Sequence, residues 1–168
     1  MTHQGKTMHS TIIAGSEDVM PNAVRRVLFL DFDGVLHPAT TTPAGRFVHA
    51  PMLANCFLQL SCDVVISSSW RHSYSIDELR HFLPDELAHL IVGTTGPAVI
   101  GKHARFQEIQ AWIARQPSPV DWRALDDCEW EFPTNTSKLF LCNANTGLSR
   151  KELLSISSWL NNAATERS

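Results

Sequence analysis

The chain has 168 residues, of which 43 % are hydrophobic and 18 % charged, a balance typical of one globular domain rather than of a disordered chain. Its formal net charge of −3 gives no overall attraction for nucleic acid or for an anionic membrane, and no apolar stretch is long enough to cross a bilayer. Four cysteines without a Cys-x-x-Cys pair argue against a disulfide framework or a zinc site, so we expect a cytoplasmic protein with reduced thiols.

The first elements predicted along the chain are a leader, a strand, a loop, a helix and a second strand. Residues 1–23 are polar and contain glycine and proline, which is typical of a flexible leader. The continuous apolar run at 27–30 predicts a strand covered on both faces, as in a parallel sheet. Glycines and prolines at 34–48 predict a loop that is too short for a cap domain. Apolar residues at helical spacing then predict a helix over 51–60, and a strand follows at 63–66.

The second half of the chain continues this alternation of helices and strands. Ser75 and Glu78 have the spacing of a capping box, which opens a short helix that Pro84 ends. A second capping box, formed by Ser149 and Glu152, opens the last helix. Between them the pattern predicts strands at 90–93, 122–125 and 139–142 and a helix over 104–115.

Strands that alternate with helices predict a Rossmann-like, doubly wound α/β fold. We expect a mostly parallel sheet with helices on both faces and no separate cap domain. The sequence contains neither an internal repeat nor a second apolar core, so we expect one catalytic domain over 24–163 and a short tail over 164–168.

Polar residues directly follow three of the predicted strands. Because ligands bind beyond the carboxyl ends of strands in open parallel sheets, we expect these residues to form one site. Carboxylates gathered in a small space repel one another unless a cation neutralises them, and Mg²⁺ prefers carboxylate and phosphate oxygens. The sequence therefore predicts Mg²⁺ as cofactor, with the choice between Asp126 and Asp127 open. The predicted metal ligands are Asp31, Asp33, Asp126 and Asp127, and the polar pair after the second strand is Ser67 and Ser68.

Three motifs resemble those of the haloacid dehalogenase-like (HAD) superfamily. Asp31-Phe32-Asp33-Gly34-Val35 resembles its first motif, Val64 to Ser68 its second, and Ala124 to Asp127 its acidic fourth motif. The segments 68–71, 106–113 and 145–149 are in addition similar to HAD domains found alone or attached to RNA-repair enzymes.

This resemblance implies roles for individual residues. Asp31 would attack phosphorus and form an aspartyl-phosphate, and Asp33 would protonate the leaving oxygen and then help to activate water. Members that act on carbon–halogen bonds usually lack an aspartate equivalent to Asp33, so phosphate chemistry is favoured. Ser68, or Ser67 if the register shifts by one residue, would bind the phosphoryl oxygens.

The resemblance also implies a set of residues around the phosphate. The backbone of Phe32 and Asp33 would approach it, and Gly34 would permit the sharp turn after the strand. Arg71 follows the serine motif and, by its position, is a candidate for a substrate contact or for a structural salt bridge. The superfamily's phosphate-stabilising cation would be Lys102 or Arg105, with Lys102 slightly preferred.

We therefore expect a Mg²⁺-dependent phosphatase, a phosphoric monoester hydrolase with an open site. Superfamily members without a cap typically accept large substrates, so the phosphorylated substrate is expected to be a nucleic-acid or nucleotide phosphate end. The alternative is a HAD-fold binding or regulatory module that turns over poorly. Nothing in the sequence indicates a membrane, a protein partner or an oligomer.

Overall fold

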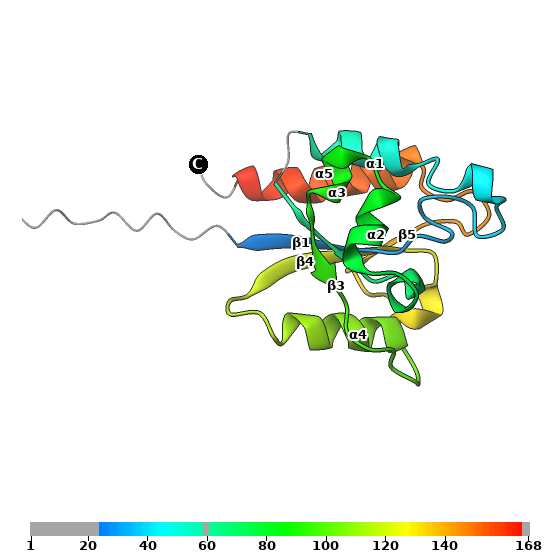
Figure 1. Ribbon diagram of the computed structural model, residues 1–168. Helices are drawn as coiled ribbons and strands as arrows, with labels where there is room; N and C mark the ends of the chain where they lie inside the picture. The colour runs from blue at the N-terminus through cyan, green and yellow to red at the C-terminus, as the bar shows by residue number, and fades with distance from the viewer. Residues whose placement is uncertain (1–23, 59–60, 166–168) are drawn as a thin grey trace, which may run out of the picture.

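The protein is built on a five-stranded sheet in the order β3-β2-β1-β4-β5, in which every neighbouring pair is parallel. The computed structural model describes residues 24–58 and 61–165, so the leader expected over 1–23 lies outside the described residues. The Rossmann-like parallel sheet is thereby confirmed (Figure 1). The strands are β1 (Arg25–Leu30), β2 (Asp63–Ile66), β3 (Ile91–Thr94), β4 (Val120–Asp126) and β5 (Leu139–Leu141).

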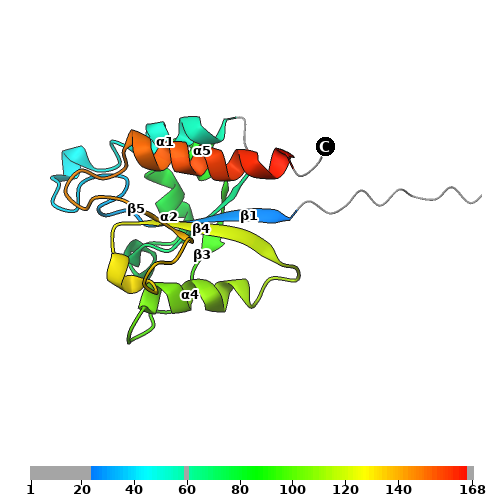
Figure 2. The ribbon, with the colours of Figure 1, turned by 180° about the vertical axis from the view of Figure 1, so that it is seen from behind.

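Helices cover both faces of this sheet. The longest helix, α5, packs with α1 on one face, whereas α4 lies alone on the other (Figures 1 and 2). The short helix α3 was not predicted, because four residues directly after a proline carry no helical periodicity. Residues 166–168 of the expected tail lie outside the described residues. The helices are α1 (Ala50–Phe57), α2 (Ile76–His81), α3 (Asp85–Ala88), α4 (Ala104–Ile113) and α5 (Arg150–Thr165), with short 3-10 turns at Pro43–Gly45, Ser69–His72 and Glu129–Glu131.

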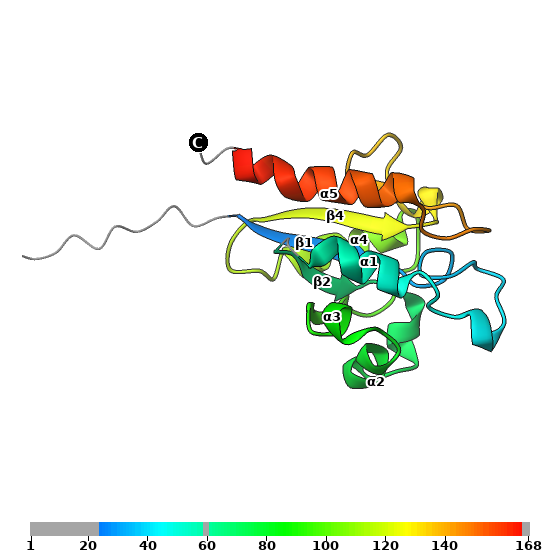
Figure 3. The same ribbon diagram turned by 90° about the horizontal axis from the view of Figure 1, so that it is seen from above.

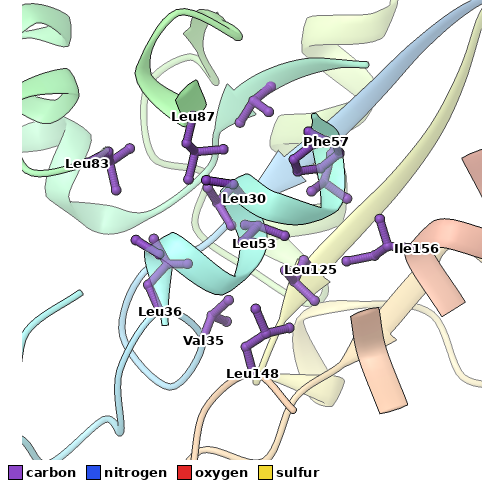
Figure 4. Close-up of a cluster of buried hydrophobic side chains, with 14 of the residues drawn as sticks. Leu30, Val35, Leu36, Leu53, Phe57, Leu83, Leu87, Leu125, Leu148 and Ile156 are labelled. Carbon is purple, nitrogen blue, oxygen red and sulfur yellow. The ribbon is translucent and has the colours of Figure 1, made fainter. Parts of the chain in front are cut away.

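The side chains of β1 divide between two hydrophobic clusters, as expected of a strand whose residues alternate between faces. Leu28 and Leu30 belong to the larger cluster, which the helices α1 and α5 cover (Figure 4). Val27 and Phe29 point the other way, where Phe29 makes an edge-to-face contact with Trp112 of α4 at 5.4 Å. All four are fully buried, so β1 is held on both faces and Asp31 at its end has a fixed position.

The carboxyl ends of all five strands point toward one edge of the sheet, where two loops meet. The segments 31–49 and 142–149 run side by side there (Figure 3). The N–H of Ala39 donates to the carbonyl of Ala144 at 2.8 Å, and His49 Nε2 lies 2.9 Å from the carbonyl oxygen of Thr146. No separate cap domain stands between β1 and α1 in the described residues, so this edge is open. None of the described helices has the length and apolar character needed to cross a bilayer.

Candidate active site

Main-chain hydrogen bonds bring the ends of β1, β2 and β4 together at this edge. The N–H of Asp31 donates to the carbonyl of Leu125 at 3.1 Å, and the N–H of Ser67 donates to the carbonyl of Leu30 at 2.9 Å. The sheet pairing thus continues one residue beyond the strands. Asp31 and Ser67, which follow β1 and β2, and Asp126, the last residue of β4, therefore lie at adjoining positions, as the parallel topology requires.

Arg105 contacts residues at all three of these strand ends. It lies in the first turn of α4, and its Nη1 atom is 3.3 Å from Asp31 Oδ1, 3.2 Å from Asp126 Oδ2 and 3.5 Å from Ser67 Oγ. Only 14 % of its side chain is exposed. Burial lowers the pKa of Arg105, but the charges of Asp31 and Asp126 raise it by more, so the group stays charged. One cation therefore sits among two carboxylates and a hydroxyl.

Asp126 is fully buried, and its two oxygens have different surroundings. Oδ1 accepts a hydrogen bond from the N–H of Cys128 at 2.9 Å. Oδ2 accepts none, although Arg105 Nη1 is 3.2 Å away, so that contact is an ion pair without the alignment of a hydrogen bond. Burial, followed by the nearby charge of Asp31, raises the pKa of Asp126 to about 8. A buried carboxylate oxygen without a hydrogen bond is suited to bind a cation.

Asp127 lies directly against Gly34. A Cβ atom added to Gly34 would be 2.0 Å from Asp127 Oδ2, closer than any van der Waals contact. The φ angle of Gly34 is +71°, in the left-handed region that favours glycine. The glycine of the first motif is thus needed both for the turn and for the approach of Asp127.

We expect Gly34→Ala to weaken Mg²⁺ binding about 10- to 100-fold, because the added methyl group displaces Asp127. The left-handed backbone adds a loss of about 1–2 kcal/mol in the free energy of unfolding. Gly101→Ala is the matched control, since Gly101 also has positive φ (+136°) but no described atom within 4 Å of an added Cβ. Metal titration and urea unfolding measure the two effects, and unchanged Mg²⁺ affinity in Gly34→Ala would contradict the role given to this glycine.

The charges at this edge fit a divalent cation bound by oxygen. Ligand atoms of Asp126, Asp127 and Cys128 lie within 4.8 Å of one another. Burial, with the charges of Asp126 and Asp127, raises the pKa of Cys128 to about 12, so its thiol stays protonated and is a poor ligand for a hard ion. Because burial raises the pKa of Asp126 to about 8, its proton would leave as a cation binds; with Asp31, Asp126 and Asp127 then all carboxylates and Arg105 opposing them, two negative charges are in excess. A Mg²⁺ ion would balance this excess.

Asp33 is held by two hydrogen-bond donors. His37 Nδ1 accepts the N–H of Phe47 at 3.2 Å, so the proton of the neutral ring is on Nε2, which donates to Asp33 Oδ1 at 3.0 Å. Trp70 Nε1 donates to Asp33 Oδ2 at 2.7 Å. The carboxyl group is therefore oriented, while 45 % of the side chain remains exposed. The sequence interpretation gave Asp33 both a proton-transfer and a metal-ligand role and assigned Trp70 to packing, although this tryptophan lies only two residues after Ser68.

Arg71 lies next to the loop that contains Ser67 and Ser68, here called the serine loop, and only 4 % of its side chain is exposed. Its Nη1 donates to the carbonyls of Ser67 (2.7 Å) and Ser68 (2.9 Å), and its Nη2 donates to Glu108 Oε2 at 2.7 Å. The guanidinium group, predicted as a substrate contact, thus holds the backbone of both serines in the structure. Glu108 was not singled out from the sequence, although its position three residues after Arg105 places both on one face of α4.

Lys102 and Phe32, two further predicted site residues, face different surroundings. Lys102 is exposed, and its ammonium forms no ion pair with any described carboxylate. The structure thus brings Arg105, and not Lys102, to the acidic cluster. Phe32 is fully buried and packs edge-to-face on Phe47 and Trp70, so only its backbone faces the loop at the strand end.

Comparison with known proteins gives one match. A family model described as the HAD domain in Swiss Army Knife RNA repair proteins matches residues 27–153. Searches of the curated proteins and of the solved structures found no match. The matched range includes β1 from Val27 onward, β2 to β5 and the first turn of α5, and so every residue of the site described above.

Proposed function

The chain belongs to the family of HAD domains in Swiss Army Knife RNA repair proteins, and from this membership and the geometry of its acidic edge we propose that it is a Mg²⁺-dependent phosphatase with Asp31 as nucleophile. One observation carries the proposal. A single nitrogen of Arg105 lies within 3.3 Å of carboxylate oxygens from the ends of two strands, Asp31 and Asp126, beside the Ser67 hydroxyl. A phosphoryl group at this place would meet a nucleophile and positive charge together.

The chemistry follows from these positions. Asp31 attacks phosphorus, so that a bond forms between its carboxylate oxygen and phosphorus while the bond from phosphorus to the leaving oxygen breaks. Asp33 gives its proton to that leaving oxygen. Water then attacks the aspartyl-phosphate, Asp33 accepts a proton from it, and inorganic phosphate is released. Arg105 and the serine loop bind the phosphoryl oxygens throughout.

The remaining assignments concern charge. Asp31, Asp126 and Asp127 would hold Mg²⁺, which when bound offsets the negative charge of the phosphoryl group and the carboxylates. We assign proton transfer to Asp33, because His37 and Trp70 orient its carboxyl group while 45 % of its side chain stays exposed on the side where the leaving group would lie. Arg71 is a positioning residue for the serine loop.

The proposed substrates are nucleic-acid or nucleotide phosphate ends, in keeping with the RNA-repair context of the family and the open edge of the sheet. The proposed location is the cytoplasm, where four unpaired thiols stay reduced.

The test is a screen of small phosphoesters and of 5′- and 3′-phosphorylated oligonucleotides, with Mg²⁺ and again with chelator, using Asp31→Asn as the blank. We expect turnover only with Mg²⁺. At tenfold excess over its dissociation constant, Mg²⁺ should also stabilise the fold by about 1.4 kcal/mol, seen as a higher Tm. Turnover that is unchanged by chelator would contradict the metal dependence. A wild type that is inactive on every phosphate would favour the alternative, a HAD-fold binding module.

A further inference from the structure

A pocket of about 380 Å³ opens beside the carboxyl group of Asp33. If Asp33 protonates the leaving oxygen, the organic part of the substrate must lie on the exposed side of this carboxyl group. The pocket is therefore in the right place to hold the leaving group. Its lining residues are Asp33, Arg46, Ser69, Trp70, Ser73 and Tyr74.

The pocket combines aromatic rings with a cation. The rings of Trp70 and Tyr74 are stacked with their centroids 5.4 Å apart and their planes at 27°. The guanidinium carbon of Arg46 lies 5.2 Å from the Trp70 ring centroid. Arg46 is exposed and pairs with no carboxylate in the described part of the chain, so its charge is available to a ligand. Tyr74 is 37 % exposed, more than Trp70, which is partly buried.

We propose that this pocket is the leaving-group subsite and that it binds the terminal nucleotide of a phosphorylated oligonucleotide. This inference rests on the proposed phosphatase function. The base stacks on the exposed aromatic surface of Tyr74 and Trp70, and Arg46 pairs with the next phosphodiester. Ser69 and Ser73 offer hydroxyl groups to the sugar and the backbone.

The two kinds of group in the pocket favour this class of ligand. A small alkyl or sugar phosphate has no aromatic ring to stack and no second anion for Arg46. A free nucleoside monophosphate has the ring but lacks the second anion. An oligonucleotide end supplies both, joined through one sugar, beside the phosphomonoester that is hydrolysed. Arg46 and the exposed face of Tyr74 thus become specificity-determining groups, separate from the residues that perform the chemistry.

The first experiment compares kcat/KM on glycerol phosphate, a nucleoside monophosphate, a phosphotyrosine peptide, and 5′- and 3′-phosphorylated oligonucleotides. We expect Arg46→Ala to lower kcat/KM on the oligonucleotides about tenfold, through KM, and to leave glycerol phosphate unchanged. Arg46→Lys keeps the charge and should restore most of the loss. Tyr74→Ala should lower kcat/KM about tenfold on the mononucleotide and the oligonucleotides alike. Arg115→Ala, which removes an exposed positive charge beyond the C-terminal end of α4, is the control and should change nothing.

A second experiment measures binding without turnover. Anisotropy of a labelled, 5′-phosphorylated oligonucleotide is followed on Asp31→Asn and on Asp31→Asn/Arg46→Ala, and we expect about tenfold weaker binding to the double variant. Equal binding to both, or an equal effect of Arg46→Ala on every substrate, would overturn the subsite. A greater loss on a phosphotyrosine peptide than on oligonucleotides would assign the pocket to peptides and overturn it too. Absence of turnover on all substrates would instead count against the phosphatase, because the binding measurement does not depend on it.

Discussion

Asp31→Asn is expected to lower kcat on p-nitrophenyl phosphate by at least about 10³-fold in the presence of Mg²⁺. The amide of asparagine is a very poor nucleophile, so the aspartyl-phosphate does not form and the covalent route is lost. Arg105 and the serine loop remain in place, so binding of the phosphoryl group should be less affected than turnover. Initial rates over a range of substrate concentrations separate kcat from KM and measure this difference.

Asparagine and aspartate are nearly equal in size, so we expect the variant to keep its fold, and this can be checked directly. Near-UV circular dichroism and Tm should match those of the wild type. Asp63→Asn is the matched control, because Asp63 begins β2 at the opposite end of the strand and pairs with Arg25. It should keep full activity. An Asp31→Asn variant that is folded and retains more than about a tenth of the wild-type kcat would rule out Asp31 as the nucleophile.

The same comparison separates the phosphatase from a weakly active binding module. In a binding module, wild type and Asp31→Asn would show the same low background on every phosphate tested. In a phosphatase, the kcat values of wild type and Asp31→Asn differ by at least about 10³-fold, and this difference disappears when chelator removes the metal. Both proteins would still bind phosphorylated ligands, so binding alone does not discriminate between them.

The elements of the fold were predictable where one local pattern sufficed. The apolar run that ends at Leu30 predicted a strand buried on both faces, and Leu28 and Phe29 are fully buried on opposite sides of the sheet. Ser75 and Glu78 predicted a helix start, and both hydrogen bonds of the capping box are present. The strand order was not predictable, because it depends on which strand edges pair, and an apolar pattern contains no information on pairing.

The sequence allowed prediction of those site residues that lie at the ends of strands. Asp31 and Asp126 meet at one edge because β1 and β4 are parallel neighbours. The choice between Lys102 and Arg105 depended instead on a single backbone angle. His103 has a φ of +56°, so the chain turns there, α4 begins at Ala104, and Lys102 stays outside the helix. A left-handed residue before a helix leaves no clear mark in the sequence.

The hydrogen bonds to Asp33 could not be predicted from the local sequence, for a different reason. His37 is only four residues away, but its ring is fixed by the N–H of Phe47, and Trp70 comes from the loop after β2. Such contacts join segments whose approach is set by the packing of the whole domain. Short motifs identify the candidate carboxyl groups, whereas the groups that orient them are found only in three dimensions.

Arg105→Ala is expected to lower kcat/KM by about 10²- to 10³-fold, the usual effect of removing one group that stabilises transition-state charge. It should also reduce the free energy of unfolding by about 3–5 kcal/mol without Mg²⁺, because two buried carboxylates lose their cation. Mg²⁺ should offset part of this loss, since it neutralises the same groups. Chemical denaturation with Mg²⁺ and with chelator, together with steady-state kinetics, measures both effects.

Lys102→Ala is the matched control for Arg105→Ala, because it removes a positive charge three residues earlier, on the exposed surface. It should change stability by less than about 0.5 kcal/mol and leave kcat/KM nearly unchanged. Arg105→Lys keeps the charge but not the fork of the guanidinium group, so it should recover stability more than activity. Strong loss of activity in Lys102→Ala with little loss in Arg105→Ala would reverse the assignment. In that case Lys102 would have to reach the phosphoryl group by a rearrangement of the turn at His103, which the ion pairs of Arg105 oppose.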